Sequence, residues 1–101
     1  MGSNMILMVT LWYPSHLTAK LGEIVPKMPK IPDYIKKWKI YQTPAGKNGF
    51  KQYHLMFIEK GKGDDALVDV GKILRPFWEQ EGVDLTIEPV YGQKDSFKVF
   101  A

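Results

Sequence analysis

The sequence contains no cysteine. Disulfide bonds, thiolate metal sites and cysteine nucleophiles are therefore excluded. The absence fits a reducing compartment, and we predict a cytoplasmic protein. The longest apolar run, 5–13, falls well short of the roughly 20 residues that a membrane-spanning helix needs. No signal-peptide cleavage pattern follows that run, so we expect no membrane association.

Histidines are also scarce, since His16 and His54 are the only two. Neither has a carboxylate close by in the sequence, so we predict no metal site. The sequence has no Ser-His-Asp pattern, P-loop or G-x-G-x-x-G motif. Gly61-Lys-Gly63 reads as a turn and not as a phosphate cradle. We therefore predict no cofactor.

The length of 101 residues, with 45% hydrophobic and 25% charged side chains, is typical of a single globular domain. We place that domain at 5–101. Residues 1–4, with the sequence Met-Gly-Ser-Asn, read as a remnant of an expression tag ahead of a native start at Met5.

The net charge of +3 is unevenly distributed. Residues 20–51 hold eight lysines against Glu23 and Asp33, a balance of +6, whereas 52–101 hold six basic and nine acidic side chains, a balance of −3. Such asymmetry can mark a surface that binds nucleic acid or another anion. The alternative is a solvated edge strand with its loop, which we favour.

Hydrophobic periodicity predicts four strands and two helices. The strands are expected at 5–13, 35–42, 50–60 and 83–88. The first helix should begin at Ser15 as its cap and end near Pro26 and Pro29, and the second should begin at Asp64 or Asp65 and end at Gly82. Asn48-Gly49 signals a hairpin between the second and third strands. The tail with Phe97, Val99 and Phe100 could add a short strand at a sheet edge.

The predicted order βαββαβ is the ferredoxin-like pattern, an α+β fold with a four-stranded antiparallel sheet. Right-handed crossovers place the first and third strands in the middle of the sheet. Both are apolar on both faces, while the second and fourth strands alternate as edge strands do. Two helices cover one face only, so the other face would expose a large apolar patch. We therefore expect a homodimer joined through that face.

This pattern over 5–92 resembles the dimeric α/β-barrel superfamily, in which two ferredoxin-like sheets face each other. That superfamily includes proteins similar to muconolactone isomerase, to the antibiotic-biosynthesis monooxygenases and to the stress-responsive barrel proteins. The resemblance implies a dimeric barrel with a cavity between the sheets. Leu11-Trp12-Tyr13-Pro14-Ser15-His16 also resembles small archaeal proteins with a Trp-Tyr-Pro-Pro-His start, with Ser15 at the second proline, and that likeness implies no activity.

His54 is the candidate catalytic residue, as a general base or a hydrogen-bond donor. It shares its strand face with Gln52, Met56 and Ile58, and we expect this face to line the barrel cavity because semi-polar residues suit a cavity. Its expected neighbours are then Met8, Thr10 and Trp12 of the first strand. With the opposite parity, Tyr53, Leu55 and Phe57 would line the cavity and His54 would lie under the helices.

The candidate ligand-binding residues are Thr10, Trp12, Tyr13, His16 and Met56. Tyr13 and His16 follow the first strand, at a position that borders the cavity mouth in the barrels that the chain resembles. The alternative for His16 is a plain surface residue in the first helical turn, and the alternative for His54 is a core histidine with a satisfied hydrogen bond.

Three functions follow from this site. The first is binding of a small apolar or aromatic ligand in the cavity between the sheets. The second is a cofactor-free isomerase or monooxygenase that uses His54, so the sequence leaves open whether the protein is an enzyme. The third is RNA binding, which we consider unlikely because Phe50 is followed by Gln52 and the first strand offers Leu7 where RNA-binding domains stack bases on aromatic residues.

Overall fold

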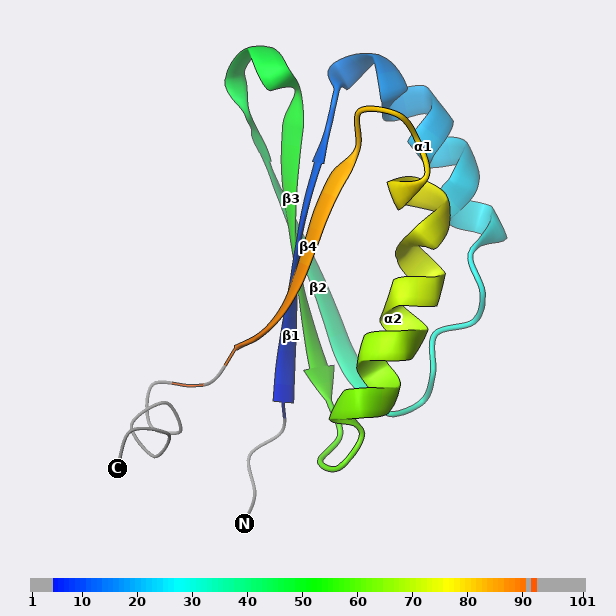
Figure 1. Cartoon of the computed structure of the whole chain (residues 1–101), viewed down its shortest axis with the longest axis vertical. Helices are drawn as coiled ribbons and strands as arrows, with labels where there is room; N and C mark the ends of the chain where they lie inside the picture. The colour runs from blue at the N-terminus through cyan, green and yellow to red at the C-terminus, as the bar shows by residue number, and fades with distance from the viewer. Residues whose placement is uncertain (1–4, 91, 93–101) are drawn as a thin grey trace.

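A computed structural model of the protein describes residues 5–90 and 92. In it, four strands and two α-helices follow one another in the order βαββαβ (Figure 1). They are β1 (Met5–Tyr13), α1 (Thr18–Ile24), β2 (Ile35–Pro44), β3 (Phe50–Ile58), α2 (Gly63–Trp78) and β4 (Asp84–Val90). Short 3-10 turns span Ser15–Leu17, Val25–Lys27 and Gly46–Asn48. The tag remnant and the tail strand that the sequence suggests both lie outside the described residues.

The strands form one antiparallel sheet in the order β2-β3-β1-β4. This confirms the predicted α+β class and the central position of the first and third strands, and the arrangement is compatible with a ferredoxin-like fold. No helix in the described part of the chain is long and apolar enough to cross a membrane.

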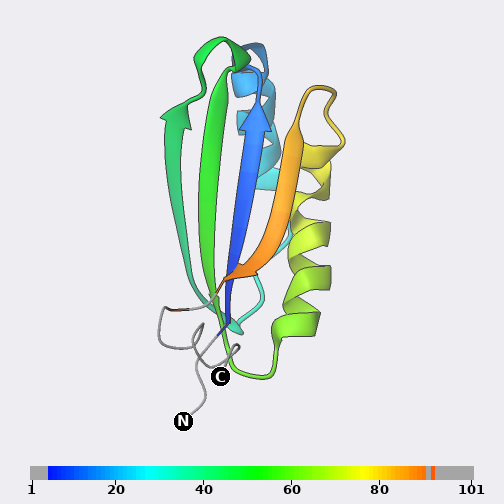
Figure 2. The same cartoon turned by 60° about the vertical axis from the view of Figure 1, so that its left-hand side comes forward.

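Both helices pack on the same face of the sheet (Figures 1 and 2). The core lies between these two layers, and its fully buried side chains include Leu7, Val9, Met56, Ile58 and Val70. On the opposite face, no other element of residues 5–90 covers the strands, and we call this surface the open face. Burial of an apolar side chain in such a core contributes about 1.5–3 kcal/mol.

The strand register decides which side chains face the helices. Val9 of β1 is paired with His54 of β3, and Leu7 is paired with Met56. Because directly paired residues point to the same face, His54 and Met56 lie under the helices. The predicted orientation of His54 toward the barrel cavity was therefore wrong. Its expected neighbours Met8, Thr10 and Trp12 all lie on the open face.

The first helix is shorter than the sequence suggests. The expected helix from Ser15 is divided into a 3-10 turn, the seven-residue α1 and a second 3-10 turn that contains Pro26. Pro26 has no amide hydrogen to continue the ladder. Ser15 does not act as a side-chain cap, and its carbonyl instead accepts a hydrogen bond from Thr18 Oγ1 at 2.7 Å. The short helix leaves the edge of the sheet uncovered, since Ile40 of β2 is 56% exposed on the helix side.

The β2–β3 connection also differs from the expected two-residue hairpin at Asn48-Gly49. The strands are joined by Ala45–Gly49, which contains a 3-10 turn, and the Ala45 amide donates to the Gly49 carbonyl at 2.8 Å. Gly49 has a φ of +100°, and a Cβ at this position would overlap the Tyr13 carbonyl oxygen. This glycine is therefore required both by its conformation and by the close approach of β1.

Substitution of Gly49 should thus be far more costly than substitution of Gly46 in the same loop. Gly46 also has a positive φ, +63°, but a Cβ there meets nothing within 4 Å. We expect Gly46→Ala to lower the free energy of unfolding by about 1–2 kcal/mol, the cost of a left-handed alanine, and Gly49→Ala to lower it by roughly 3 kcal/mol or more. Chemical denaturation measures both. Equal losses would contradict the close packing of the loop on Tyr13.

Candidate functional site

A cavity of about 270 Å³ lies between α1 and the sheet. Its floor is formed by β1, β2 and β3, its roof by α1 and the following 3-10 turn, and one wall by Leu74 and Phe77 of α2. Most of its lining is apolar or aromatic, and the polar lining side chains are Tyr13, Thr18, Gln52 and His54. No charged residue lines it among the residues that the structure describes. A small apolar molecule is the ligand that such a lining suits.

The mouth of this cavity lies beside the edge strand β2. Ile40 of β2 and Val25 of the 3-10 turn both line the cavity and are both more than half exposed, at 56% and 55%. Gly22 of α1 also lines it, and a Cβ there would meet no atom within 4 Å. The cavity is therefore open to solvent between α1 and β2, and Gly22 leaves room in its roof.

The polar side of the cavity is a chain of side-chain hydrogen bonds across three strands. Trp38 Nε1 donates to His54 Nδ1 at 2.9 Å, and His54 Nε2 is 3.0 Å from Gln52 Oε1. Gln52 Nε2 then donates to Gln42 Oε1 at 2.8 Å, and the Tyr13 hydroxyl donates to the same oxygen at 2.9 Å. Every bond in the chain has one donor and one acceptor when His54 is neutral and carries its proton on Nε2.

Burial keeps His54 in this neutral form. The side chain is 5% exposed, and desolvation lowers the pKa of its imidazole from 6.5 to about 4. A protonated ring would also place an N–H group against the Trp38 N–H. Near pH 7 both ring nitrogens are occupied, so His54 has no free lone pair with which to accept a proton from a substrate.

The cavity can nevertheless hold one polar atom of a ligand. Gln52 uses one amide hydrogen for Gln42 and retains a second, and the Tyr13 hydroxyl oxygen retains acceptor capacity. A neutral oxygen or nitrogen on a ligand could bond there. A charged group would lose its hydration and find no opposite charge among the lining residues.

The structure divides the predicted site residues between two faces of the sheet. Tyr13 and His54 line the cavity, while Met56 is fully buried beneath the helices and does not line it. Thr10 and Trp12 lie on the open face. His16 is exposed in the 3-10 turn before α1.

The contributions of β2 and α1 to this cavity were not predicted from the sequence. Trp38, Gln42, Gly22 and Val25 were not among the predicted site residues. The alternation of Trp38, Ile40 and Gln42 along β2 was a usable signal, because residues two apart share a face. The alternation alone does not give the register with β3, which pairs Ile40 with His54 and Gln42 with Gln52.

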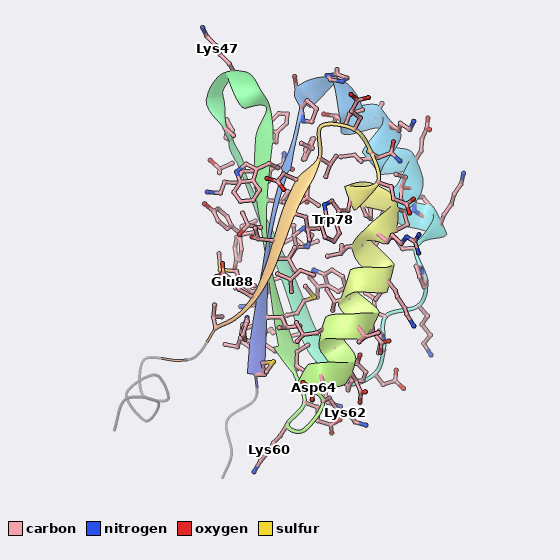
Figure 3. All side chains as sticks on the ribbon, viewed as in Figure 1. Lys47, Lys60, Lys62, Asp64, Trp78 and Glu88 are labelled. Carbon is pink, nitrogen blue, oxygen red and sulfur yellow. The ribbon has the colours of Figure 1, made fainter. Side chains whose placement is uncertain are left out.

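The open face has an apolar centre between two edges of opposite charge. On the β2 edge stand Lys37 and Lys39, and on the β4 edge stand Asp84 and Glu88, the latter pointing away from the helices in Figure 3. The half-buried centre consists of Ile6, Met8, Trp12, Tyr53, Leu55 and Phe57. The Lys51 ammonium lies 5.3 Å from the Trp12 ring and 4.9 Å from the Tyr53 ring. A contiguous, partly exposed apolar surface of this kind is typical of an interaction site.

The low pKa of His54 predicts a specific pH dependence of stability. Below pH 6.5 the unfolded chain binds a proton at His54 that the folded chain does not bind until about pH 4. The free energy of unfolding should therefore fall as the pH falls from 6.5 to 4, by about 3 kcal/mol at most, since one pKa unit is ~1.4 kcal/mol. Urea denaturation at a series of pH values measures this.

The two histidines provide the matched control for that measurement. His54→Gln should lose this part of the pH dependence, whereas His16→Gln, at an exposed position, should keep it. A His54→Gln variant with the same pH profile as the unsubstituted protein would show that His54 is not buried in its neutral form.

Comparison with known proteins found no family model, no curated protein and no solved structure that matches this chain.

Proposed function

We propose that this protein binds a small, neutral, apolar or aromatic molecule in the cavity between α1 and the sheet. The observation that carries the proposal is the cavity itself, which joins an apolar lining to the hydrogen-bonded side chains of Tyr13, Gln52 and His54. An apolar cavity of roughly 150 Å³ is enough to bind benzene. The volume of about 270 Å³ therefore suits a molecule of one or two rings.

This proposal changes the position of the ligand that the sequence suggested. The ligand lies within one chain, under α1, and not between two sheets. Proton transfer by His54 in an isomerase or monooxygenase reaction is less well supported, because Trp38 occupies Nδ1 and Nε2 faces Gln52. His54 instead holds the polar side of the cavity in one arrangement.

A leucine at Gly22, in the exposed roof of the cavity, should weaken binding without loss of the fold. The leucine in Gly22→Leu would extend from the roof of the cavity, and the helix itself would gain because glycine is about 1 kcal/mol worse than alanine in a helix interior. We expect indole and 1-naphthol to bind the unsubstituted protein and to raise its melting temperature. The variant should bind them at least tenfold more weakly in isothermal titration calorimetry.

Gly71→Leu on α2 is the matched control, because Gly71 also has no atom within 4 Å of a Cβ and lies outside this cavity. It should bind both compounds as the unsubstituted protein does. If Gly22→Leu folded and bound indole with unchanged affinity, the ligand site would not be this cavity.

We further propose that two copies form a homodimer through their open faces. The supporting observation is the charge pattern, because a two-fold axis parallel to the strands places β2 of one copy over β4 of the other. Within one sheet, Lys39 and Glu88 stand in the same row across the strands. This axis therefore brings Lys39 of one copy opposite the partner's Glu88. An axis perpendicular to the strands would place β2 over β2, with lysines against lysines.

Single-stranded RNA is the competing occupant of the open face. The argument from the sequence against RNA binding considered residues that lie on the helix-covered face of the sheet. On the open face, the corresponding side chains include Trp12, Tyr53 and Phe57. A stacking platform for bases is thus present. The dimer is better supported because Asp84 and Glu88 would repel phosphates and because the aliphatic side chains at the centre have no role in stacking.

Exchange of the charges of Lys39 and Glu88, which stand on opposite edges of the sheet, tests the dimer and its axis together. Lys39→Glu should weaken the dimer by roughly tenfold, because the substitution occurs twice per dimer and each exposed ion pair contributes about 0.2–1 kcal/mol. Glu88→Lys should do the same, and the double variant should recover the affinity. Sedimentation equilibrium measures all four proteins.

A monomer at 100 micromolar that binds an oligouridylate would overturn the dimer and assign the open face to nucleic acid. A dimer whose affinity does not change with either substitution would contradict the proposed axis.

A further inference from the structure

The unpaired edge of β2 differs from the opposite edge of the sheet. Its residues from Lys37 to Pro44 pair with β3 on one side only. The other edge strand, β4, has seven residues and carries Pro89, which cannot donate a hydrogen bond on its free side. In β2 the only proline is the last residue, Pro44. A further strand can therefore pair along most of β2 but is obstructed on β4.

The helix side of β2 offers apolar surface to such a strand. Trp38 and Ile40 lie on this side, and Ile40 is 56% exposed because α1 does not extend over the edge. Across the mouth of the cavity, Val25 is 55% exposed. A strand added beyond β2 would place every second side chain beside these residues.

The other side of the same edge is basic. Lys37 and Lys39 stand on the open face of β2, and Lys36 lies at the irregularity in the register between Ile35 and Lys37. Lysines at a sheet edge discourage pairing with an identical edge, so a second copy of β2 is a poor partner. They attract a strand that carries carboxylates on the matching face.

We propose that the edge of β2 accepts an extended acidic peptide as a fifth strand. The peptide would alternate apolar and acidic residues, with the apolar side chains against Ile40 and Val25 and a carboxylate against Lys37, since Lys39 faces the partner's Glu88 in the proposed dimer. Backbone hydrogen bonds to β2 supply the affinity, and the two faces supply the specificity. This goes beyond the proposed ligand and dimer, because copies that meet face to face leave the β2 edge unpaired.

The probe for this proposal is the capped hexapeptide Glu-Val-Glu-Val-Glu-Val, labelled with fluorescein. We expect it to bind in fluorescence anisotropy and to bind more weakly as salt is raised. Two control peptides separate strand addition from simple charge attraction. One has the same composition in the order Glu-Glu-Glu-Val-Val-Val, and the other has methyl groups on alternate backbone nitrogens. Both should bind at least tenfold more weakly.

A pair of protein variants locates the site. Ile40→Asp should weaken binding of the alternating peptide at least tenfold, while Val68→Asp on α2, which is 55% exposed, should leave it unchanged. Both positions are exposed, so neither variant should lose the fold.

Equal binding of the methylated peptide, or equal effects of the two aspartates, would overturn the proposal. Binding of an oligouridylate that competes with the peptide and depends on Ile40 would also overturn it, since this edge would then serve nucleic acid. Because Ile40 itself lines the cavity, indole binding by the unsubstituted protein and by Val68→Asp reports on the cavity separately, so failure of one proposal can be told from failure of the other.

Discussion

The pairing of Val9 with His54 is the constraint on which the rest of the structure depends. It places an imidazole under the helices, where an unpaired polar group would be costly. Trp38 on one side and Gln52 on the other remove that cost by hydrogen bonding both ring nitrogens. The cavity therefore has a fixed polar side in a neutral environment. The same pairing places Trp12, Tyr53 and Phe57 on the open face.

The short α1 connects the cavity to the edge of the sheet. Because Pro26 interrupts the helix, the roof ends before β2, and the cavity opens between Val25 and Ile40. A longer helix would cover Ile40 and close both the cavity and the β2 edge. Pro26 thus leaves the helix side of the sheet open at its β2 edge. The open face is uncovered for another reason, because both α-helices pack on the opposite side of the sheet.

The strand order could be predicted from the sequence, but the face of the sheet on which the site lies could not. Strands that are apolar on both faces belong in the centre of the sheet, and β1 and β3 follow this rule. The parity of β3 was misjudged because polar residues were assumed to avoid the helix-covered face. His54 is acceptable there because it is hydrogen bonded to Trp38 and to Gln52, which in turn donates to Gln42. The positions of Trp38 and Gln42 opposite β3 depend on the five-residue loop Ala45–Gly49. A two-residue turn at Asn48-Gly49 would have given another register.

The three tryptophans allow one direct test of the central claim, that the ligand cavity lies between α1 and the sheet. Trp38 lines the cavity, Trp12 lies on the open face, and Trp78 is exposed on α2. Their indole N–H groups give separate signals in a ¹H–¹⁵N NMR spectrum, which can be followed while 1-naphthol is added. We predict a saturable shift of the Trp38 signal with Trp12 and Trp78 unchanged. A shift of Trp12 with Trp38 unchanged would place the ligand on the open face and contradict the account.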